Sequence, residues 1–305
     1  MGQDTFRFCF IITVNVLKLQ WDYVLLPDQQ STCLSKAKPA DGSGQKNKNR
    51  DIKTMKTYLK SVLLLLFLGL SVQAQADIQL AQSLHELRSE GYRAATYMLI
   101  DNNLYERIRE PGNRETYNEA LGNMERALRT LDNPGALRTP YNEFLRLIRA
   151  LESRSDDEAH YHLATVNEIM MAHADFDKAA AARYAEAASG LDEKLLALHQ
   201  QSLETSQILL LYQNNMFSSI GVYFMETSEG IFNRMDANIT ARYATLKSML
   251  PELSSTLDSL NKQYGFIQPR LLDYHSDWVP TIAAFYLTRN TNTLNQLARD
   301  QALQS

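Results

Sequence analysis

Apolar residues recur every three or four positions along most of the chain after residue 77, which is the spacing of a helix with one buried face. One such face, within the segment 113–131, consists of Tyr117, Leu121, Met124, Leu128 and Leu131. The same stretch of chain has no sustained alternation of apolar and polar residues bounded by hairpin turns, which is the pattern of strands. The sequence therefore predicts an all-α fold, an antiparallel helical bundle.

Start and stop signals divide the first part of this pattern into separate helices. Asp77 is predicted to cap the first helix. Pro111-Gly112 is predicted to interrupt the chain before a helix capped by Asn113. After the turn at Asp132 to Gly135, Thr139 and Pro140 are expected to open the next helix, because proline is favoured at the first helical position.

Two long helices are predicted in the middle of the chain. Ser155 and Glu158 form a capping box for a helix that is expected to end at Gly190. The next helix is predicted from Leu191 to about Met225 and contains the apolar run Ile208 to Tyr212. Because this run is apolar on all sides, it is expected in the middle of the bundle.

Asparagine and proline residues mark the boundaries that are predicted near the end of the chain. Asn238 is expected to start a helix that Gly265 closes. Pro251 lies inside this pattern and predicts a kink or a break, since proline removes a backbone donor. Pro269 and Pro280 are expected to begin two further helices.

Residues 55–76 have the three parts of an export signal. A short start with two lysines precedes the apolar segment Val62 to Leu70, and Ala74-Gln75-Ala76 is a small-x-small cleavage site. The apolar segment is about half of the roughly 20 residues that a membrane-spanning helix needs. A cleaved signal is therefore expected, with Ala74 and Ala76 at the cleavage site, Asp77 as the first mature residue and no membrane span afterwards.

Residues 1–54 do not fit this interpretation, because an export signal normally stands near the N-terminus. Met55 is the natural start, so residues 1–54 are interpreted as a mis-annotated or disordered leader. They are excluded from the prediction of the fold.

Charge and cysteine content support an exported, acidic protein. The first 76 of the 305 residues hold 10 of the 31 basic and 5 of the 35 acidic residues, which leaves 21 and 30 and a formal charge of −9. Such a charge argues against nucleic acid or an anionic membrane as partner. Both cysteines, Cys9 and Cys33, also precede the cleavage site. An exported chain of this size without disulfides is typical of a bacterial periplasm, so periplasmic or secreted localisation in a Gram-negative bacterium is expected.

The mature chain is predicted to form two helical halves, residues 77–190 and 191–305, which are either separate or packed as one domain. Shifted by 126 positions, Thr130-Leu131-Asp132 falls on Thr256-Leu257-Asp258. Two interpretations stay open: an old duplication that made two tandem pseudo-repeated halves, or a chance match between helices of the same heptad phase.

No motif commits the sequence to a chemistry. Phosphate-binding loops, haem sites, zinc-protease helices and nucleophile elbows are missing from the sequence, and no cofactor or enzymatic activity is predicted. His162, His173 and Asp177 are the best metal-ligand candidates, since His173 and Asp177 are four residues apart on a predicted helix. The alternative, which the pattern favours, is a set of surface histidines paired with carboxylates.

Aromatic residues are concentrated in the second half. Most are interpreted as core, and the last helix is expected to run through Ile282, Phe285 and Tyr286. The segment 273–278 combines polar and aromatic groups between two predicted helix starts. Tyr274, His275 and Trp278 are therefore the candidates for binding a ligand or a protein partner.

Two hypotheses about function follow from these observations. The leading hypothesis is a non-enzymatic periplasmic bundle that binds another envelope protein as adaptor, accessory or inhibitor. The alternative is a periplasmic protein that binds or senses a small molecule or a divalent metal. An enzyme, such as a metal-assisted hydrolase, is a distant third, because carboxylates and histidines from separate helices would have to converge.

Overall fold

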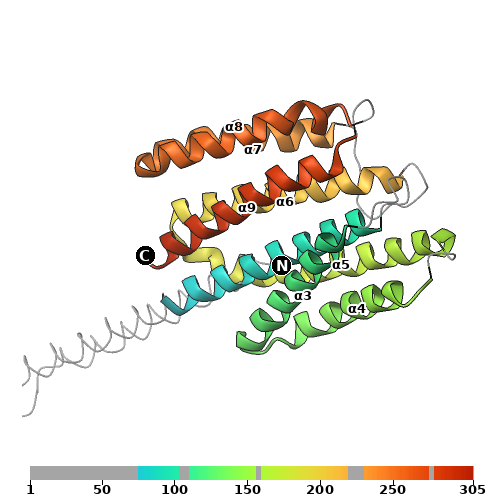
Figure 1. Ribbon diagram of the computed structural model, residues 1–305. Coiled ribbons are helices and arrows are strands. Elements are labelled where there is room, and N and C mark those ends of the chain that lie inside the picture. Colours follow the sequence, from blue (N-terminus) through green and yellow to red (C-terminus); the bar gives the residue numbers. More distant parts are fainter. Residues whose placement is uncertain (1–74, 103–109, 156–158, 219–229, 275–277, 305) are drawn as a thin grey trace, which may run out of the picture. The chain divides into compact units, whose positions relative to one another are not determined.

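The computed structural model describes residues 75–102, 110–155, 159–218, 230–274 and 278–304. Every regular element within these ranges is helical, which confirms the all-α helical bundle (Figure 1). The predictions for residues 1–54, and for the signal as far as Ala74, lie outside the described residues. The tandem duplication stays a prediction.

The first described helix covers residues 75–101 and is called helix 75–101 below. The helices and 3-10 turns that follow are α3 (Pro111–Thr130), α4 (Gly135–Glu152), α5 (Ala159–Ala187), η2 (Ala188–Gly190), α6 (Glu193–Ser218), α7 (Ile231–Met249), η3 (Pro251–Leu253), α8 (Ser254–Leu272) and α9 (Pro280–Ala302).

Helix 75–101 is central among the described helices. Its side chains contact α3 through Asp101, α5 through Arg88, α6 through Gln82 and α9 through His85. Most of its residues from position 81 onwards are buried. Beyond it, α6 packs extensively against α9, and α7 and α8 cover the opposite side of that pair (Figure 1).

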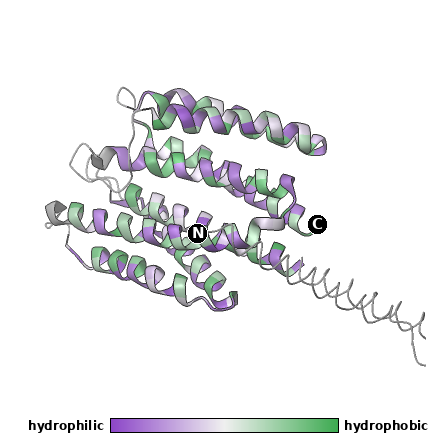
Figure 2. Cartoon of the chain, turned by 180° about the vertical axis from the view of Figure 1, so that it is seen from behind, coloured by the Kyte–Doolittle hydropathy of each residue, from purple (hydrophilic) through white to green (hydrophobic). Residues whose placement is uncertain are grey.

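The hydrophobic core contains large aromatic side chains as well as leucines. The apolar run Ile208 to Tyr212 is at most 3% exposed, which confirms its predicted place in the middle of the bundle. Polar and apolar residues are mixed along every helix in Figure 2, as expected where each helix has one buried and one exposed face. The largest fully buried side chains include Tyr117, Tyr141, Tyr212, Tyr243, Tyr264, Phe144 and Phe176.

Three predicted helix starts in the first half are wrong. Asp77 lies inside helix 75–101, which already includes residues 75 and 76, and does not cap it. Helix α3 begins at Pro111 rather than after Asn113, because proline itself takes the first helical position. Helix α4 begins at Gly135 and includes Pro140. It starts early because the Pro134 carbonyl accepts hydrogen bonds from the backbone N–H groups of Leu137, at 2.9 Å, and Arg138, at 2.8 Å.

Near the end of the chain, Pro251 and Pro280 mark boundaries as predicted. Helices α7 and α8 are separated at Pro251, and α9 begins at Pro280. The other three predictions are wrong, since Asn238 lies inside α7 while Gly265 and Pro269 lie inside α8. Packing outweighs these weak local preferences, because buried apolar residues lie within two positions of each one: Ile239, Tyr264, Ile267 and Leu271.

Within the described ranges, the structure contains no helix that combines the length and the apolar character needed to cross a membrane.

Candidate functional site

Helix α9 places polar side chains in the interior of the bundle. Asn290, Thr291 and Asn295 are at most 7% exposed, although they lie on the same helix face as fully buried leucines. Polar residues of helix 75–101 and α6 face them. The set is called the polar seam and consists of Gln82, His85, Ser89, His199, Ser202, Ser206, Thr291 and Asn295.

Asn295 is the centre of the polar seam. Its side-chain Oδ1 accepts hydrogen bonds from His85 Nε2, at 2.9 Å, and from the Ser202 hydroxyl. Its Nδ2 donates to the Ser89 hydroxyl at 2.7 Å. One amide thus joins three helices, and a shift of α9 along its axis would leave buried polar groups without partners.

Two histidines of the seam stack on each other. The rings of His85 and His199 have centroids 4.0 Å apart and planes inclined by 11°. His199 Nε2 lies 2.8 Å from Gln82 Oε1, and the Tyr184 hydroxyl lies 2.9 Å from His199 Nδ1. Because amide oxygens can only accept, both rings carry their proton on Nε2, and Tyr184 donates to Nδ1.

Burial keeps both histidines neutral. It lowers the pKa of His85 to about 4, against the opposing hydrogen bond to Asn295 and with the support of the nearby Arg88 charge. Burial also lowers the pKa of His199 to about 2, and the His85 ring acts in the same direction. Imidazoles with such low pKa values carry too few protons near neutral pH to act as general acids. Both rings are therefore neutral near neutral pH and contribute through their stacking and hydrogen bonds.

A buried ion pair lies beside the seam. Arg88 of helix 75–101 donates to both carboxylate oxygens of Asp177 of α5, at 2.7 and 3.1 Å. The Tyr92 hydroxyl donates to the same carboxylate at 2.9 Å, and Gln207 donates to that hydroxyl at 3.1 Å. Burial alone would raise the pKa of Asp177, but the hydrogen bond and charge of Arg88 outweigh it and lower the pKa. The carboxylate therefore stays ionised and fully engaged.

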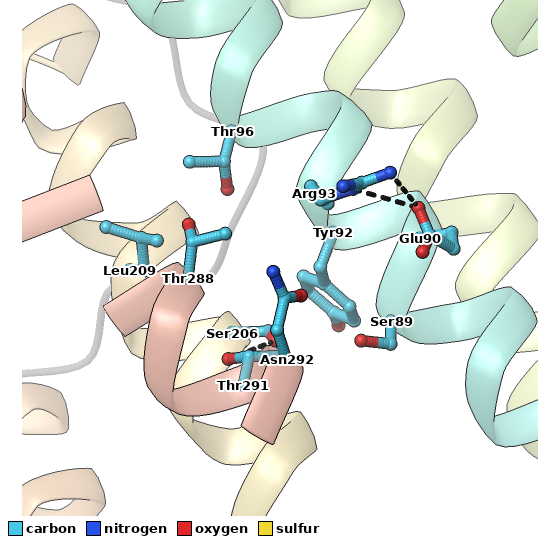
Figure 3. Close-up of a pocket in the computed structure, with 10 residues that line it drawn as sticks. All are labelled: Ser89, Glu90, Tyr92, Arg93, Thr96, Ser206, Leu209, Thr288, Thr291 and Asn292. Atoms are coloured by element: carbon cyan, nitrogen blue, oxygen red, sulfur yellow. Dashed lines mark hydrogen bonds and ion pairs between the residues drawn. The ribbon is translucent and has the colours of Figure 1, made fainter. Parts of the chain in front are cut away.

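A small cavity between helix 75–101, α6 and α9 opens beside the seam, as Figure 3 shows. Its volume is about 20 Å³, room for one water molecule. Six of its ten lining residues carry a hydroxyl group, and its two charged residues, Glu90 and Arg93, pair with each other at 2.9 Å. The lining residues are Ser89, Glu90, Tyr92, Arg93, Thr96, Ser206, Leu209, Thr288, Thr291 and Asn292.

The hydroxyls of the seam are not arranged as nucleophiles. Ser202 donates to Asn295, and Ser206 donates to the main-chain carbonyl of Ser202 at 3.1 Å. Neither hydroxyl is hydrogen-bonded to a histidine that could remove its proton, as nucleophilic catalysis requires. The hydrogen bonds of both hydroxyls therefore join helices or stay within α6.

The predicted binding residues in the segment 273–278 lie at the edge of the core. Trp278 stacks on Tyr212, with centroids 4.4 Å apart and planes inclined by 22°. Tyr274 packs against Phe232 at 4.8 Å. Both side chains are half-buried, and His275 lies outside the described residues. Much of the aromatic surface of Tyr274 and Trp278 thus packs against other residues of the chain. Only the exposed edges of these two side chains stay candidates for binding a ligand or a partner.

Two of the predicted metal ligands, His173 and Asp177 of α5, both contact Tyr92 of helix 75–101 and are committed to contacts within the bundle. His173 is also not the surface histidine that the alternative interpretation predicts, because it is buried. His173 is 2% exposed and meets the Tyr92 ring edge-on at 4.8 Å, while Asp177 is held by Arg88. The side chain of His162 is outside the described residues, and Ala76, of the predicted cleavage site, is exposed on helix 75–101. Within the described part of the chain, no three His, Cys, Asp or Glu residues are placed to share a metal ion.

Large apolar side chains gather on the outside of α8 and α9. Phe266, Ile282 and Phe285 are 53%, 46% and 59% exposed. The half-buried Tyr286 connects two of them, with its ring 5.0 Å from that of Phe266 and 5.3 Å from that of Phe285. Phe266, Ile282, Phe285 and Tyr286 are called the aromatic patch below.

This patch corrects the interpretation of the aromatic residues Phe266 and Phe285 as core. The buried face of α9 is set by Leu287, Leu294 and the polar residues between them. At about 100° per residue, Phe285 points about 200° away from Leu287 and therefore outward. The same spacing puts Thr291 on the buried face, where the apolar pattern alone does not predict a polar residue.

Comparison with known proteins adds no further assignment. The chain matches no protein-family model. No curated protein and no solved structure shows significant similarity to it. The candidate site is thus defined by geometry alone: a self-satisfied polar seam inside the bundle and an aromatic patch outside it.

Proposed function

We propose that this protein is a non-enzymatic binding protein of the cell envelope. In this proposal the exported helical bundle holds another envelope protein, as adaptor, accessory or inhibitor, on the aromatic patch of α8 and α9. The observation that carries the proposal is the exposure of Phe266, Ile282 and Phe285 on regular helices.

Aromatic anchors on a rigid support are what a protein interface needs. Burying a large apolar side chain contributes about 1.5–3 kcal/mol, so three such residues represent a substantial binding free energy. The contacts of Tyr286 with Phe266 and Phe285 hold the rings in place before a partner arrives. Little side-chain entropy is then lost on binding, which favours affinity.

The interior gives less support to a small-molecule site. The cavity beside the polar seam is about 20 Å³, whereas ligand pockets are usually about 300–1,000 Å³. A second hollow of about 350 Å³ lies between helix 75–101, α3 and α9. Two of its charged side chains, Glu86 and Arg299, already pair at 3.1 Å. These hollows are therefore weaker candidates than the aromatic patch.

Export is part of the proposal and rests on the sequence. The signal-like segment 55–76, the missing cysteines after it and the acidic charge of the remaining chain favour an envelope location. An adaptor or inhibitor in that compartment needs a stable fold and an exposed recognition surface, and no reactive groups.

Purification of the tagged protein from envelope extract tests the proposal. We expect one partner in stoichiometric amount, and we expect the double variant Phe266→Ser/Phe285→Ser to lose it. Met171 of α5 is 55% exposed and provides the matched control, because Met171→Ser removes an exposed apolar side chain elsewhere. Recovery of the protein alone, or equal loss of the partner in the control, would contradict the proposal.

A further inference from the structure

The aromatic patch has a cationic border. On α8, Lys262 and Arg270 lie four residues before and after Phe266, so the three side chains share one helix face. The Arg270 guanidinium carbon lies 5.8 Å from the centre of the Phe266 ring. On α9, Arg289 follows Phe285 by four residues. Apolar anchors are thus flanked by positive charge one helical turn away on both helices.

This region differs in charge from the rest of the protein. From Ser259 to Arg299 the sequence has four basic residues and only two acidic ones, Asp273 and Asp277, both after the end of α8. The chain after residue 76 carries 21 basic and 30 acidic residues. A positive border on an acidic protein implies that local charge, not net charge, determines which partner approaches the patch.

Arg289 also differs from most arginines of the bundle. It is exposed and forms no ion pair within the described part of the chain. In contrast, ion pairs are formed by Arg88, Arg93, Arg114, Arg129, Arg138, Arg146, Arg149, Arg242 and Arg299. Its guanidinium is therefore available to a carboxylate from outside the chain.

A shallow groove continues from the patch along α9. Its volume is about 570 Å³, and it runs from Phe285 past Arg289 and Asn292 to Gln296, with Tyr97 of helix 75–101 in its wall. From Phe285 to Gln296 the axis of α9 rises about 17 Å, at about 1.5 Å per residue. This length accommodates about three turns of a helix whose apolar face covers the patch.

We infer that the patch and its groove bind an acidic amphipathic helix of a protein partner. This inference rests on the proposed function and specifies the partner of the same surface. The apolar residues of the partner helix cover Phe266, Ile282 and Phe285. Its Asp or Glu residues, one turn away from these apolar residues, pair with Arg289.

The charges of the chain also disfavour two other occupants of the patch, a second copy of the chain and an anionic membrane. In a twofold dimer of this chain through the patch, Arg270 and Arg289 would face the same cations of the second copy, which is repulsive. An anionic membrane would attract the border but repel the acidic remainder of the protein. An acidic helix of a partner protein avoids the repulsion between like cations, and it is small enough to contact the positive border alone.

Photo-crosslinking identifies the occupant directly. p-Benzoylphenylalanine replaces Phe285 in the full chain expressed in its own cells, and the same residue at Met171 serves as control. After irradiation, mass spectrometry identifies the crosslinked peptide. We expect a segment with apolar residues at helical spacing and acidic residues within one turn of them.

The alternative results separate the two proposals. A partner segment that is neutral or basic would overturn the acidic helix and leave the proposed function standing. Crosslinks to lipid or to a second copy of the chain would overturn both. Equal crosslinking from positions 285 and 171 would also remove the proposed function.

Charge reversal provides the quantitative test. Arg289→Glu should lower the crosslinking yield at limiting partner concentration about tenfold, since losing an attraction and adding a repulsion amounts to roughly 1.4 kcal/mol or more. Lys178 of α5 is exposed on another helix, and Lys178→Glu makes nearly the same change in net charge. Equal yields for Arg289→Glu and the unmodified chain would overturn the inference.

Discussion

The polar seam and the aromatic patch are opposite exceptions to the usual distribution of polarity, and α9 contributes to both. Its inner face buries Thr291 and Asn295, whereas its outer face exposes Ile282 and Phe285. The seam residues satisfy one another through hydrogen bonds across three helices. The patch residues have no comparable cover within the described chain. A polar interior that is satisfied maintains the fold, and an apolar surface that is not covered is available to a partner.

Acid should break the polar seam and leave the patch unaffected. The unfolded chain binds protons on His85 and His199 near pH 6.5, whereas burial keeps the folded pKa values at about 4 and about 2. The stability that the neutral rings contribute is present above pH 6.5 and is lost as the pH falls, up to about 3 kcal/mol per histidine by pH 4. Denaturant titrations from pH 7 to pH 4 measure this loss together with that of His173 of α5, whose pKa burial also lowers to about 4.

A histidine variant assigns the acid effect to the seam. His199→Gln should reduce the slope of unfolding free energy against pH by up to about 1.4 kcal/mol per pH unit, which corresponds to one proton. Phe285→Ser should leave the slope unchanged, because the patch contains no group that titrates between pH 4 and pH 7. Equal slopes for His199→Gln and the unmodified protein would show that the stacked pair is not the acid-sensitive element.

The next largest effect on the free energy of unfolding is expected from removing the side-chain amide of Asn295. Asn295→Ala leaves His85 Nε2 and the hydroxyls of Ser89 and Ser202 without their partner in the interior. At about 1–3 kcal/mol for each unsatisfied buried group, a loss of about 3–5 kcal/mol in unfolding free energy is expected. Asn292, exposed three residues earlier on α9, gives the control, and Asn292→Ala should change stability by less than about 0.5 kcal/mol. Similar losses in the two variants would disprove a special role for Asn295.

A milder change tests the edge of the seam. Tyr184→Phe removes the hydroxyl that donates to His199 Nδ1 and keeps the aromatic ring. One buried acceptor then loses its partner, so the unfolding free energy should fall by about 1–2 kcal/mol. Thermal and denaturant unfolding at pH 7 measure it. Unchanged stability would indicate that water replaces the hydroxyl.

The sequence predicts the helices well and the seam poorly, for a physical reason. Helical periodicity is local, so the apolar run Ile208 to Tyr212 is correctly placed in the interior. Hydrogen bonds of the seam join residues far apart in the chain, such as His85 and Asn295, which are 210 positions apart. No spacing rule connects such residues. The seam therefore becomes visible only when the helices are packed.

The helix boundaries also show the limit of local sequence signals. Pro251 and Pro280 act as predicted, because the residue before each proline, Leu250 or Val279, is held out of the helical conformation. Pro269 lies inside α8, where Ile267 and Leu271 are fully buried on both sides of it. A local break signal thus yields where the core requires another turn of helix. The sequence does not predict the patch for a related reason, because its residues are apolar and the apolar pattern indicates core.

The substitution with the smallest expected effect on stability, Phe285→Ser, distinguishes the aromatic patch from the polar seam most clearly. Phe285→Ser removes a side chain that is 59% exposed, so the unfolding free energy should change by less than about 0.5 kcal/mol. The same substitution should reduce partner binding at least about tenfold, because it removes an aromatic anchor from the proposed interface. Denaturant unfolding and co-purification on the same preparations measure the two quantities. A loss of stability above about 2 kcal/mol would mean that the ring serves the fold, as the seam does, and that its exposure is no sign of a partner.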